Sequence, residues 1–309
     1  MFVYTQKKFT MKNIFKIASG IALSLILFSS CNVENLKETY TPVEVSEVSF
    51  TQANINATSI PAAQTSFDIV LSRNTPENAV TVNITSTLPS SITAPASVSF
   101  AAGETTAIFS INVSKMPVGA QIKGSLSIDE SFANKNVAIM TTSLTLAKAY
   151  TWVSLGMGQW FDNLALMSAS SYGIQPVEVL KAEGFERYRI MNPYANTNQL
   201  IASWSEANIG TNRSAYIEFW VLPNDLNVSW GTFWYCGLIY DGAGTDIKAY
   251  LPSYLSATYA ADDAKSQIDR TDKVVWFYPY WYIDGLGGFG TKYPCVLSFP
   301  GGPNLEDYL

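Results

Sequence analysis

The chain has 309 residues, of which 25 are acidic, 19 are basic and none is histidine, so its formal net charge is −6. Without histidine there is no Ser-His-Asp or Cys-His catalytic set and no histidine-ligated metal site. Three cysteines are too few for a disulfide-built scaffold or a four-thiolate metal site, and the acidic balance argues against a nucleic-acid partner.

The first thirty residues have the pattern of a secretory signal peptide. Residues 1–30 carry four lysines and no acid, followed by an apolar run from Ile17 to Phe28. A spanning helix needs roughly 20 apolar residues, more than this run contains. Small residues at Ser29 and Ser30 complete the pattern of a signal that is cleaved.

The end of this signal, LFSSC, resembles a bacterial lipobox, in which the cysteine is acylated and becomes the first residue of the mature protein. Phe28 stands where the usual motif has leucine, a departure common in Bacteroidetes-type lipoproteins. The resemblance implies lipidation of Cys31, residues 31–40 as a tether, and a position on the outer membrane at the cell surface. The alternative is ordinary cleavage that leaves Cys31 unmodified.

Residues 41–148 alternate apolar and polar side chains with period two, and turn residues separate the runs every eight to twelve positions. Such spacing predicts an antiparallel, immunoglobulin-like β-sandwich. The clearest strands are expected over Ser66–Arg73, Val80–Thr85, Ser97–Phe100 and Thr105–Val113, and the pairs Leu126 and Ile128, then Leu144 and Leu146, continue the pattern.

The segment SFDIVLSRN…VTVNIT…PASVSFAAGETTAIFSINV resembles a Calx-beta or related immunoglobulin-like module. Some Calx-beta domains bind calcium through acidic clusters, and a calcium ion takes six to eight oxygen ligands. The acids available here are scattered: Asp68, Glu104, Asp129 and Glu130. We therefore expect a spacer rather than a calcium site.

Residues 149–309 form a second, aromatic domain. All eight tryptophans lie at or beyond Trp152, and fifteen of the seventeen tyrosines lie at or beyond Tyr150. Strands are expected over Ala215–Leu222, Phe233–Tyr240 and Val274–Ile283, so this domain should also be mostly β. Two cysteines in predicted strands, Cys236 and Cys295, form either a disulfide or two buried thiols.

The segment WVSLGMGQWFDN…VEVLKAEGFERYRIMNPY resembles the C-terminal module of Bacteroidetes surface lipoproteins. Such proteins accompany outer-membrane nutrient-uptake systems of the starch-utilisation type. The resemblance implies a setting, capture and import at the cell surface beside a transporter, rather than a reaction.

The run WFYPYWY is the most suggestive binding feature. Alternation places four aromatic residues on one face, namely Trp276, Tyr278, Tyr280 and Tyr282, and assigns Phe277, Trp281 and Ile283 to the core. Because Pro279 cannot donate to a ladder, we expect an edge strand or a bulge. An exposed row of these rings could stack on sugars or hold an extended peptide, and the alternative is burial of both faces between sheets. Trp230 and Trp234 are a second candidate pair.

Two glycine-rich segments resemble ligand loops in their letters but are interpreted as a plain loop and a plain turn. The run Gly285–Gly290 matches the letters of a dinucleotide loop, but no helix pattern follows it, so we expect a flexible loop. The segment Asp241–Asp246 places two acids in a glycine loop, which we interpret as a turn rather than a metal site.

The sequence as a whole predicts a non-catalytic, lipid-anchored envelope protein without metal or cofactor, which captures a glycan or peptide or serves as a subunit of an uptake complex. One alternative is a structural or protein-interaction lipoprotein. Another is a glycoside hydrolase that uses two carboxylates. The second domain offers these candidates: Asp162, Glu178, Glu206, Glu218, Asp225, Asp241 and Asp284.

Overall fold

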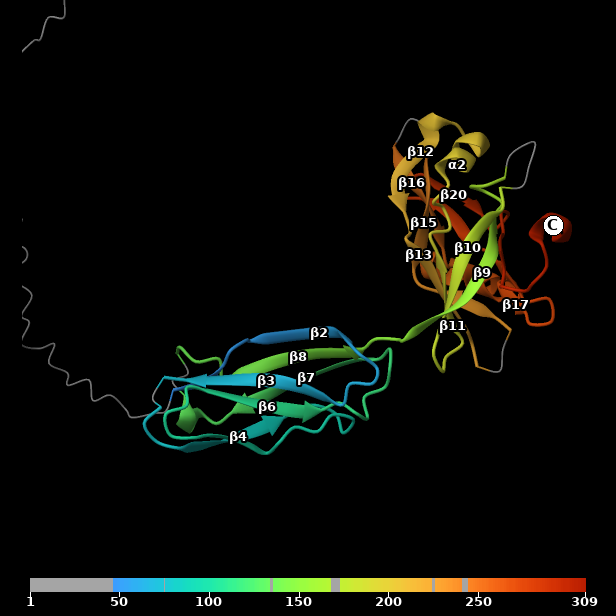
Figure 1. Cartoon of the computed structure of the whole chain (residues 1–309). Helices are drawn as coiled ribbons and strands as arrows, with labels where there is room; N and C mark the ends of the chain where they lie inside the picture. Colours follow the sequence, from blue (N-terminus) through green and yellow to red (C-terminus); the bar gives the residue numbers. More distant parts are fainter. Residues whose placement is uncertain (1–46, 75, 134–135, 168–172, 224–225, 241–243) are drawn as a thin grey trace, which may run out of the picture.

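The computed structural model describes residues 47–309, apart from 75, 134–135, 168–172, 224–225 and 241–243. Cys31, the signal and the tether therefore lie outside the described residues. Within them the fold is mainly β, as predicted, with four sheets and two large hydrophobic cores that share no residue (Figure 1). No helix in the described ranges is long and apolar enough to cross a membrane.

The N-terminal core lies between a three-stranded sheet, in the order β1-β3-β6, and a five-stranded sheet, in the order β2-β8-β7-β4-β5. The strands are β1 Val48–Phe50, β2 Asn54–Ile60, β3 Ser66–Arg73, β4 Val80–Ser86, β5 Ser97–Phe100, β6 Thr106–Asn112, β7 Gln121–Ile128 and β8 Thr141–Lys148. A short 3₁₀ helix, η2, covers Glu130–Phe132.

The predicted alternation sets the inner faces of this sandwich. Ile69 and Leu71 of β3 and Phe109 of β6 are buried. The pairs Leu126 and Ile128 of β7 and Leu144 and Leu146 of β8 are buried as well. One detail of the antiparallel prediction is wrong, because β2 pairs parallel with β8. The reason is that the chain crosses from one sheet to the other after β1. β1 pairs with β3 in the three-stranded sheet, whereas β2 lies in the other sheet beside β8, the last strand of the sandwich.

The second part of the chain contains an eight-stranded sheet, in the order β14-β13-β11-β10-β9-β21-β18-β17, and a five-stranded sheet, in the order β12-β15-β16-β19-β20. The strands are β9 Trp152–Asp162, β10 Gln175–Ala182, β11 Arg187–Met191, β12 Ile209–Arg213, β13 Tyr216–Val221, β14 Val228–Trp230, β15 Phe233–Tyr240, β16 Thr245–Tyr250, β17 Gln267–Asp269, β18 Val274–Phe277, β19 Tyr280–Ile283, β20 Gly287–Gly290 and β21 Cys295–Ser298. The helical segments are α2 Thr197–Ser203, η3 Glu206–Asn208, α3 Pro252–Leu255, η4 Ala257–Lys265 and α4 Leu305–Tyr308.

The eight-stranded sheet nearly closes on itself. Its two outer strands, β14 and β17, meet through a bridge between Asn227 and Gln267. Flanking backbone bonds run from Val228 N to the Ser266 carbonyl and from Ile268 N to the Leu226 carbonyl, each at 2.9 Å. The two outer strands are therefore bonded to each other over part of their length, so this sheet approaches a barrel, in which no edge is left unpaired.

Aromatic rings from both C-terminal sheets fill one shared core. Trp160 of β9, Phe277 of β18 and Trp234 of β15 lie with ring centroids 5.7 to 6.4 Å apart, mostly edge to face. Trp281 of β19 contacts Trp234 in the same way at 6.4 Å. Edge-to-face packing of this kind is favourable beyond the area that it buries. The inner face of each sheet is therefore covered by the other sheet.

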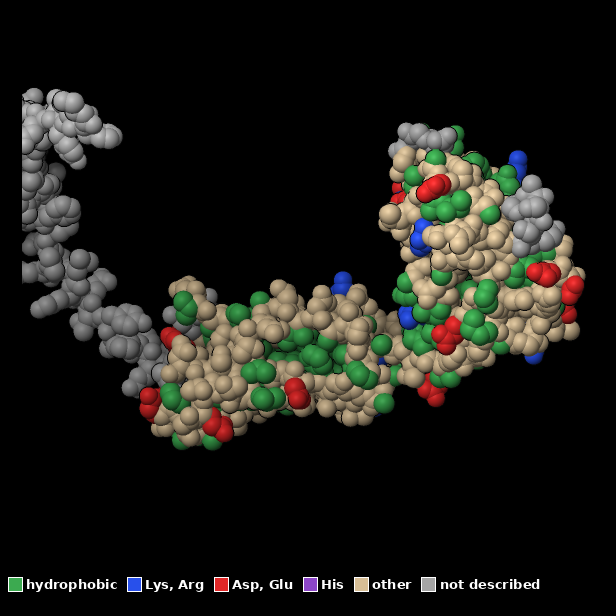
Figure 2. Space-filling model, turned by 45° about the horizontal axis from the view of Figure 1, so that its top comes forward, with side chains coloured by type: hydrophobic (Ala, Val, Ile, Leu, Met, Phe, Trp, Pro, Cys, Tyr) green, Lys and Arg blue, Asp and Glu red, His purple; other side chains and the backbone are tan. Residues whose placement is uncertain are grey.

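Charged side chains are sparse on the surface. Figure 2 shows hydrophobic side chains spread among polar ones over both parts of the chain, with scattered acidic residues and few basic ones. A group of neighbouring cations on such a surface is therefore an exception that calls for an explanation.

Candidate functional site

The aromatic run of residues 276–282 is divided between two sheets. β18 pairs with β21 in the eight-stranded sheet, whereas β19 pairs with β16 in the five-stranded sheet. Tyr278 and Pro279 lie between the two strands. Because proline cannot donate to a ladder, the first strand ends before it and the chain crosses to the other sheet. The expectation that all four aromatic residues share one face is therefore wrong.

The burial expected from the alternation is confirmed. Phe277, Trp281 and Ile283 are buried, with exposed fractions of 0 to 4%. The four residues assigned to the binding face, Trp276, Tyr278, Tyr280 and Tyr282, are all half-buried. The alternative in which both faces are fully enclosed does not describe this segment.

Trp276 lies on the outer face of the eight-stranded sheet beside the last residues of the chain. Its ring stacks on Tyr278 at 6.4 Å and lies 6.5 Å from Tyr308 in α4. A small core that includes Val274 and Leu305 packs under these rings. Trp276 therefore has a neighbour in α4 and is a poor candidate for a ligand platform.

The second candidate pair is a correction. Trp230 and Trp234 are 2% and 3% exposed and belong to the central core. Alternation in β15 turns Trp234 inward, where its indole N–H donates to the Tyr194 hydroxyl at 2.9 Å. Neither ring can meet a ligand at the surface.

The outer face of the five-stranded sheet gathers the remaining rings. We call it the aromatic face and define it by Phe233 and Tyr235 of β15, Tyr250 of β16, Tyr280 and Tyr282 of β19, and Tyr259 of η4. In the register of the sheet, Phe233, Tyr250 and Tyr280 form one cross-strand row, and Tyr235, Lys248 and Tyr282 form the next. All six rings are half-buried, so each keeps part of its surface in solvent.

The rings support one another across the strands. Phe233 lies 5.0 Å from Tyr250 and 5.2 Å from Tyr235. Tyr250 meets Tyr282 edge to face at 5.9 Å, and Tyr259 lies over Tyr280 at 4.6 Å. Cross-strand aromatic pairs stabilise a sheet and restrict rotamers, so this surface is held in place before any ligand arrives.

Lys248 occupies the middle of the aromatic face. Its ammonium lies 4.9 Å from the Phe233 ring centroid and 5.6 Å from that of Tyr235. It pairs with Asp284 at 2.5 Å, and the Tyr250 hydroxyl donates to the same carboxylate at 3.2 Å. The hydrogen bond from Lys248 lowers the pKa of Asp284, so this carboxylate is ionised at neutral pH. The face thus combines flat apolar rings with a fixed polar pair.

A bare strand borders this surface. Gly288 of β20 pairs with Tyr282, and a Cβ atom there would lie 2.6 Å from Cε1 of Tyr280 and 3.2 Å from Cδ2 of Tyr282. The glycine therefore lets both rings lie close over the neighbouring strand. The prediction of a loop over Gly285–Gly290 is wrong for its last four residues, which form β20.

The sequence reasoning named only Tyr280 and Tyr282 of this face. It missed Phe233, Tyr235, Tyr250 and Tyr259 because these residues are scattered along the chain. Alternation within Phe233–Tyr240 already turned Phe233 and Tyr235 to one side, but it could not show which other strand would lie beside them.

The remaining predicted sites lie elsewhere. Cys236 and Cys295 are free, buried thiols, so the disulfide alternative is not present in this structure. Cys31 and the loop residues 241–243 are outside the described residues. The scattered acids of the N-terminal sandwich bond locally: Asp68 accepts from Ser110, Glu104 from the Ala101 N–H, and Asp129 from the Ser131 N–H. Among the described residues no three potential ligands gather as a metal site would require.

Two of the carboxylates considered for hydrolysis, Asp225 and Asp241, lie outside the described residues, and described ones bond separately to protein groups. Asp162 is fully buried and accepts hydrogen bonds from Tyr194 and from two backbone N–H groups. Glu178 accepts from Ser154, and Glu218 pairs with Arg187 and Arg189 at 2.5 and 2.7 Å. These contacts engage each group with protein rather than leaving two carboxyls facing a shared space.

A second set of surface aromatics is already occupied by arginines. On the outer face of the eight-stranded sheet, the Arg189 guanidinium lies between Trp152 and Tyr216 at 4.0 and 4.1 Å. Arg187 lies 4.5 Å from the ring centroid of Trp220. Cation–π stacking occupies a face of each of these three rings, whereas on the aromatic face Lys248 lies over two of the six rings. The arginine-covered surface is therefore the weaker candidate.

The fold and this surface define a class: a mainly β protein whose second part presents an aromatic sheet face. No protein-family model matches the sequence, and a comparison with curated proteins finds no match. Among solved structures, CBD12 from CALX1.2 is 11% identical, with 47% of this chain and 79% of that chain covered and a TM-score of 0.29. A "putative carbohydrate binding protein" from Bacteroides ovatus is 10% identical, with 83% and 77% covered and a TM-score of 0.26. Both similarities are distant.

Proposed function

We propose that this protein is a non-catalytic binding protein that captures a glycan on its aromatic face. The observation that carries the proposal is the pair of cross-strand rows, Phe233–Tyr250–Tyr280 and Tyr235–Lys248–Tyr282. Sugar rings have apolar faces that stack on aromatic rings, and their hydroxyls bond to charged and phenolic groups. The Lys248–Asp284 pair and the tyrosine hydroxyls would supply those bonds.

Binding rather than hydrolysis is favoured by the state of the carboxylate on this face. A glycosidase needs a protonated carboxylic acid on one side of the scissile bond and a second carboxylate on the other. Asp284 has a lowered pKa because Lys248 bonds to it, which makes it a poor general acid. Docking of a protein partner on the same face, for example a transporter, is the competing role.

Affinity electrophoresis of the exported chain through gels containing single soluble polysaccharides tests the proposal. We expect one polysaccharide to retard the protein, and the double variant Tyr280→Ala, Tyr282→Ala to lose at least about ten-fold in affinity. Tyr216→Ala is the matched control, because it removes a half-exposed tyrosine from the other sheet. Absence of retardation over a broad panel, or equal retardation of the double variant, would refute capture by this face.

We propose further that acylated Cys31 holds the protein on the outer membrane, at the cell surface and beside an uptake transporter. The support is the sequence pattern alone: a basic start, a short apolar run, and small residues before the cysteine. Cys31→Ser should move the protein from the membrane fraction to the soluble fraction, and protease added to intact cells should remove the wild-type protein. Mass spectrometry that finds an unmodified Cys31 thiol would exclude the anchor, and purification of the native protein without a transporter would exclude the complex.

A further inference from the structure

A cavity of about 360 Å³ lies at one end of the nearly closed eight-stranded sheet. Its walls come from β9, β10, β11 and β17, from the turn after β17, and from the residues that follow β21. None of the residues that line it belongs to the five-stranded sheet, so it is separate from the aromatic face. Ligand sites often lie at the mouths of barrels, where several strands end together.

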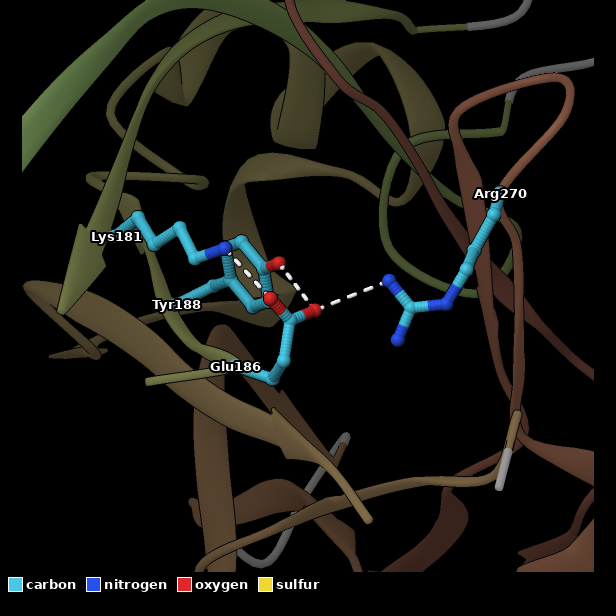
Figure 3. Close-up of polar contacts among 4 residues, drawn as sticks. All are labelled: Lys181, Glu186, Tyr188 and Arg270. Atoms are coloured by element: carbon cyan, nitrogen blue, oxygen red, sulfur yellow. Dashed lines mark hydrogen bonds and ion pairs between the residues drawn. The ribbon is translucent and has the colours of Figure 1, made fainter. Parts of the chain in front are cut away.

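Three cations line this cavity: Lys181, Arg270 and Lys273. A neighbouring carboxylate, Glu186, accepts from Lys181 at 2.6 Å and from Arg270 at 3.0 Å, and Figure 3 shows it between the two. Partial burial raises the pKa of Glu186, but hydrogen bonds from Lys181, Tyr188 and Arg270 outweigh this and lower it to about 2. One ionised carboxylate therefore pairs with two of the three cations.

Lys273 is the cation without an acidic partner. In the described part of the chain its ammonium forms no ion pair, and its recorded contact is a 3.5 Å hydrogen bond to the Gly301 carbonyl. Arg270 gives Glu186 one of the five N–H donors of a guanidinium and is half exposed. The residues that line the cavity thus include three cations and no acid, and a positively charged lining attracts anions.

The floor of the cavity is apolar. Tyr188 is buried and meets Phe299 edge to face at 5.1 Å, while the Lys181 ammonium lies 5.3 Å from the Tyr188 ring centroid. Leu155 and Pro300 extend the same surface. A ligand that fills this space would need an apolar side as well as a negative charge.

We propose that this cavity binds a small anionic ligand in which a carboxylate or sulfate is joined to a ring with an apolar face, as in a uronic acid. Lys273 and Arg270 hold the oxyanion by charge-assisted hydrogen bonds, and Leu155, Phe299 and Pro300 contact the ring. The inference goes beyond glycan capture on the aromatic face, since the two surfaces share no residue.

Isothermal titration of the exported chain with sodium glucuronate, glucose and sodium sulfate tests this site. We expect glucuronate to bind at least about ten-fold more tightly than glucose or sulfate, and its affinity to fall as salt is raised. Lys273→Gln should weaken glucuronate about five- to ten-fold, whereas Lys292→Gln, an exposed lysine outside the cavity, should change nothing.

Three results would overturn the site: no heat with glucuronate, equal affinity for glucuronate and glucose, or an unchanged Lys273→Gln variant. Sulfate binding as tight as glucuronate would refute the role of the apolar floor. The Tyr280→Ala, Tyr282→Ala variant should bind glucuronate like the wild type, so failure of this site and failure of the aromatic face give different results.

Discussion

The Lys248 ammonium lies 2.5 Å from the Asp284 carboxylate, although Lys248 belongs to β16 and Asp284 lies in the turn directly after β19. Lys248 is largely enclosed by rings, with 13% of its side chain exposed, whereas Asp284 is 52% exposed. The pair therefore fixes the ammonium among the rings and presents the carboxylate to solvent. This arrangement gives the aromatic face a polar centre that does not depend on a bound ligand.

Replacing Asp284 by asparagine should lower the free energy of unfolding at neutral pH by less than about 1 kcal/mol, because a half-exposed pair is screened by water. The pKa of Asp284 is lowered by its hydrogen bond from Lys248. A lowered carboxyl pKa stabilises the native state above the unfolded pKa, and that stability is lost as pH falls through the folded pKa. Urea unfolding of both proteins at pH 7 and near pH 2 should show the difference shrinking in acid. A difference that is the same at both pH values would contradict the pairing.

Gly288→Ala should disturb the aromatic face more than the rest of the fold. The new methyl group would lie 2.5 Å from the Trp281 carbonyl oxygen and 2.6 Å from the Tyr280 ring. Overpacking of this kind costs about 1–3 kcal/mol, and here it displaces a ring that we assign to glycan binding. Thermal unfolding and affinity electrophoresis measure the two effects.

Gly231→Ala is the matched control for this substitution, because its Cβ would meet no atom within 4 Å. We expect it to leave both stability and binding within error of the wild type. Equal behaviour of the two alanine variants would show that the close approach at Gly288 does not hold the rings.

Asp162 should make stability fall as pH rises from about 4 to 6. Burial raises its pKa to about 6, against hydrogen bonds from Tyr194 and two backbone N–H groups that lower it. The native state then binds this proton more tightly than the unfolded chain, whose carboxyl has a pKa near 3.8. The contribution of Asp162 to stability is fully present below the unfolded pKa. About 3 kcal/mol is lost as pH rises through the folded pKa.

Asp162→Asn provides the comparison, because asparagine keeps the shape and cannot ionise. Between pH 4 and pH 6, the free energy of unfolding of the wild type should fall relative to that of Asp162→Asn. Above pH 7 the difference between the two proteins should stay constant. Urea unfolding over this range measures it. Parallel pH profiles for the two proteins would mean that the buried carboxyl does not titrate there.

Cys236 and Cys295 should resist alkylation in the native protein. Both thiols are buried, and burial raises the pKa of each above its usual value, which suppresses the reactive thiolate. Iodoacetamide should leave both unmodified under native conditions and modify both in denaturant without reductant. A disulfide-linked peptide containing the two residues, absent after reduction, would contradict the two free thiols of the structure.

The amino-acid sequence by itself determined the mainly β class, the position of several strands and the inner faces of those strands. Period-two alternation located β3 over Ser66–Arg73 and β15 over Phe233–Tyr240 with the bounds that the structure has, and it assigned Phe277 and Trp281 to the core. Alternation succeeds because the local backbone sets the direction of each side chain in a strand. A strand with one buried face must therefore carry an apolar residue at every second position.

Only the tertiary structure decided which strands lie side by side, and with them the candidate site. Nothing local in the run around Pro279 shows that Trp276 joins one sheet and Tyr280 another, or that Tyr280 faces Tyr250 thirty residues earlier. The cavity residues Lys181, Tyr188 and Arg270 and their shared partner Glu186 likewise meet only because the sheet nearly closes. Strand pairing depends on how the whole core packs. A sequence pattern can therefore predict that a ring lies on the outer face of a strand, but it cannot predict which residues lie beside that ring.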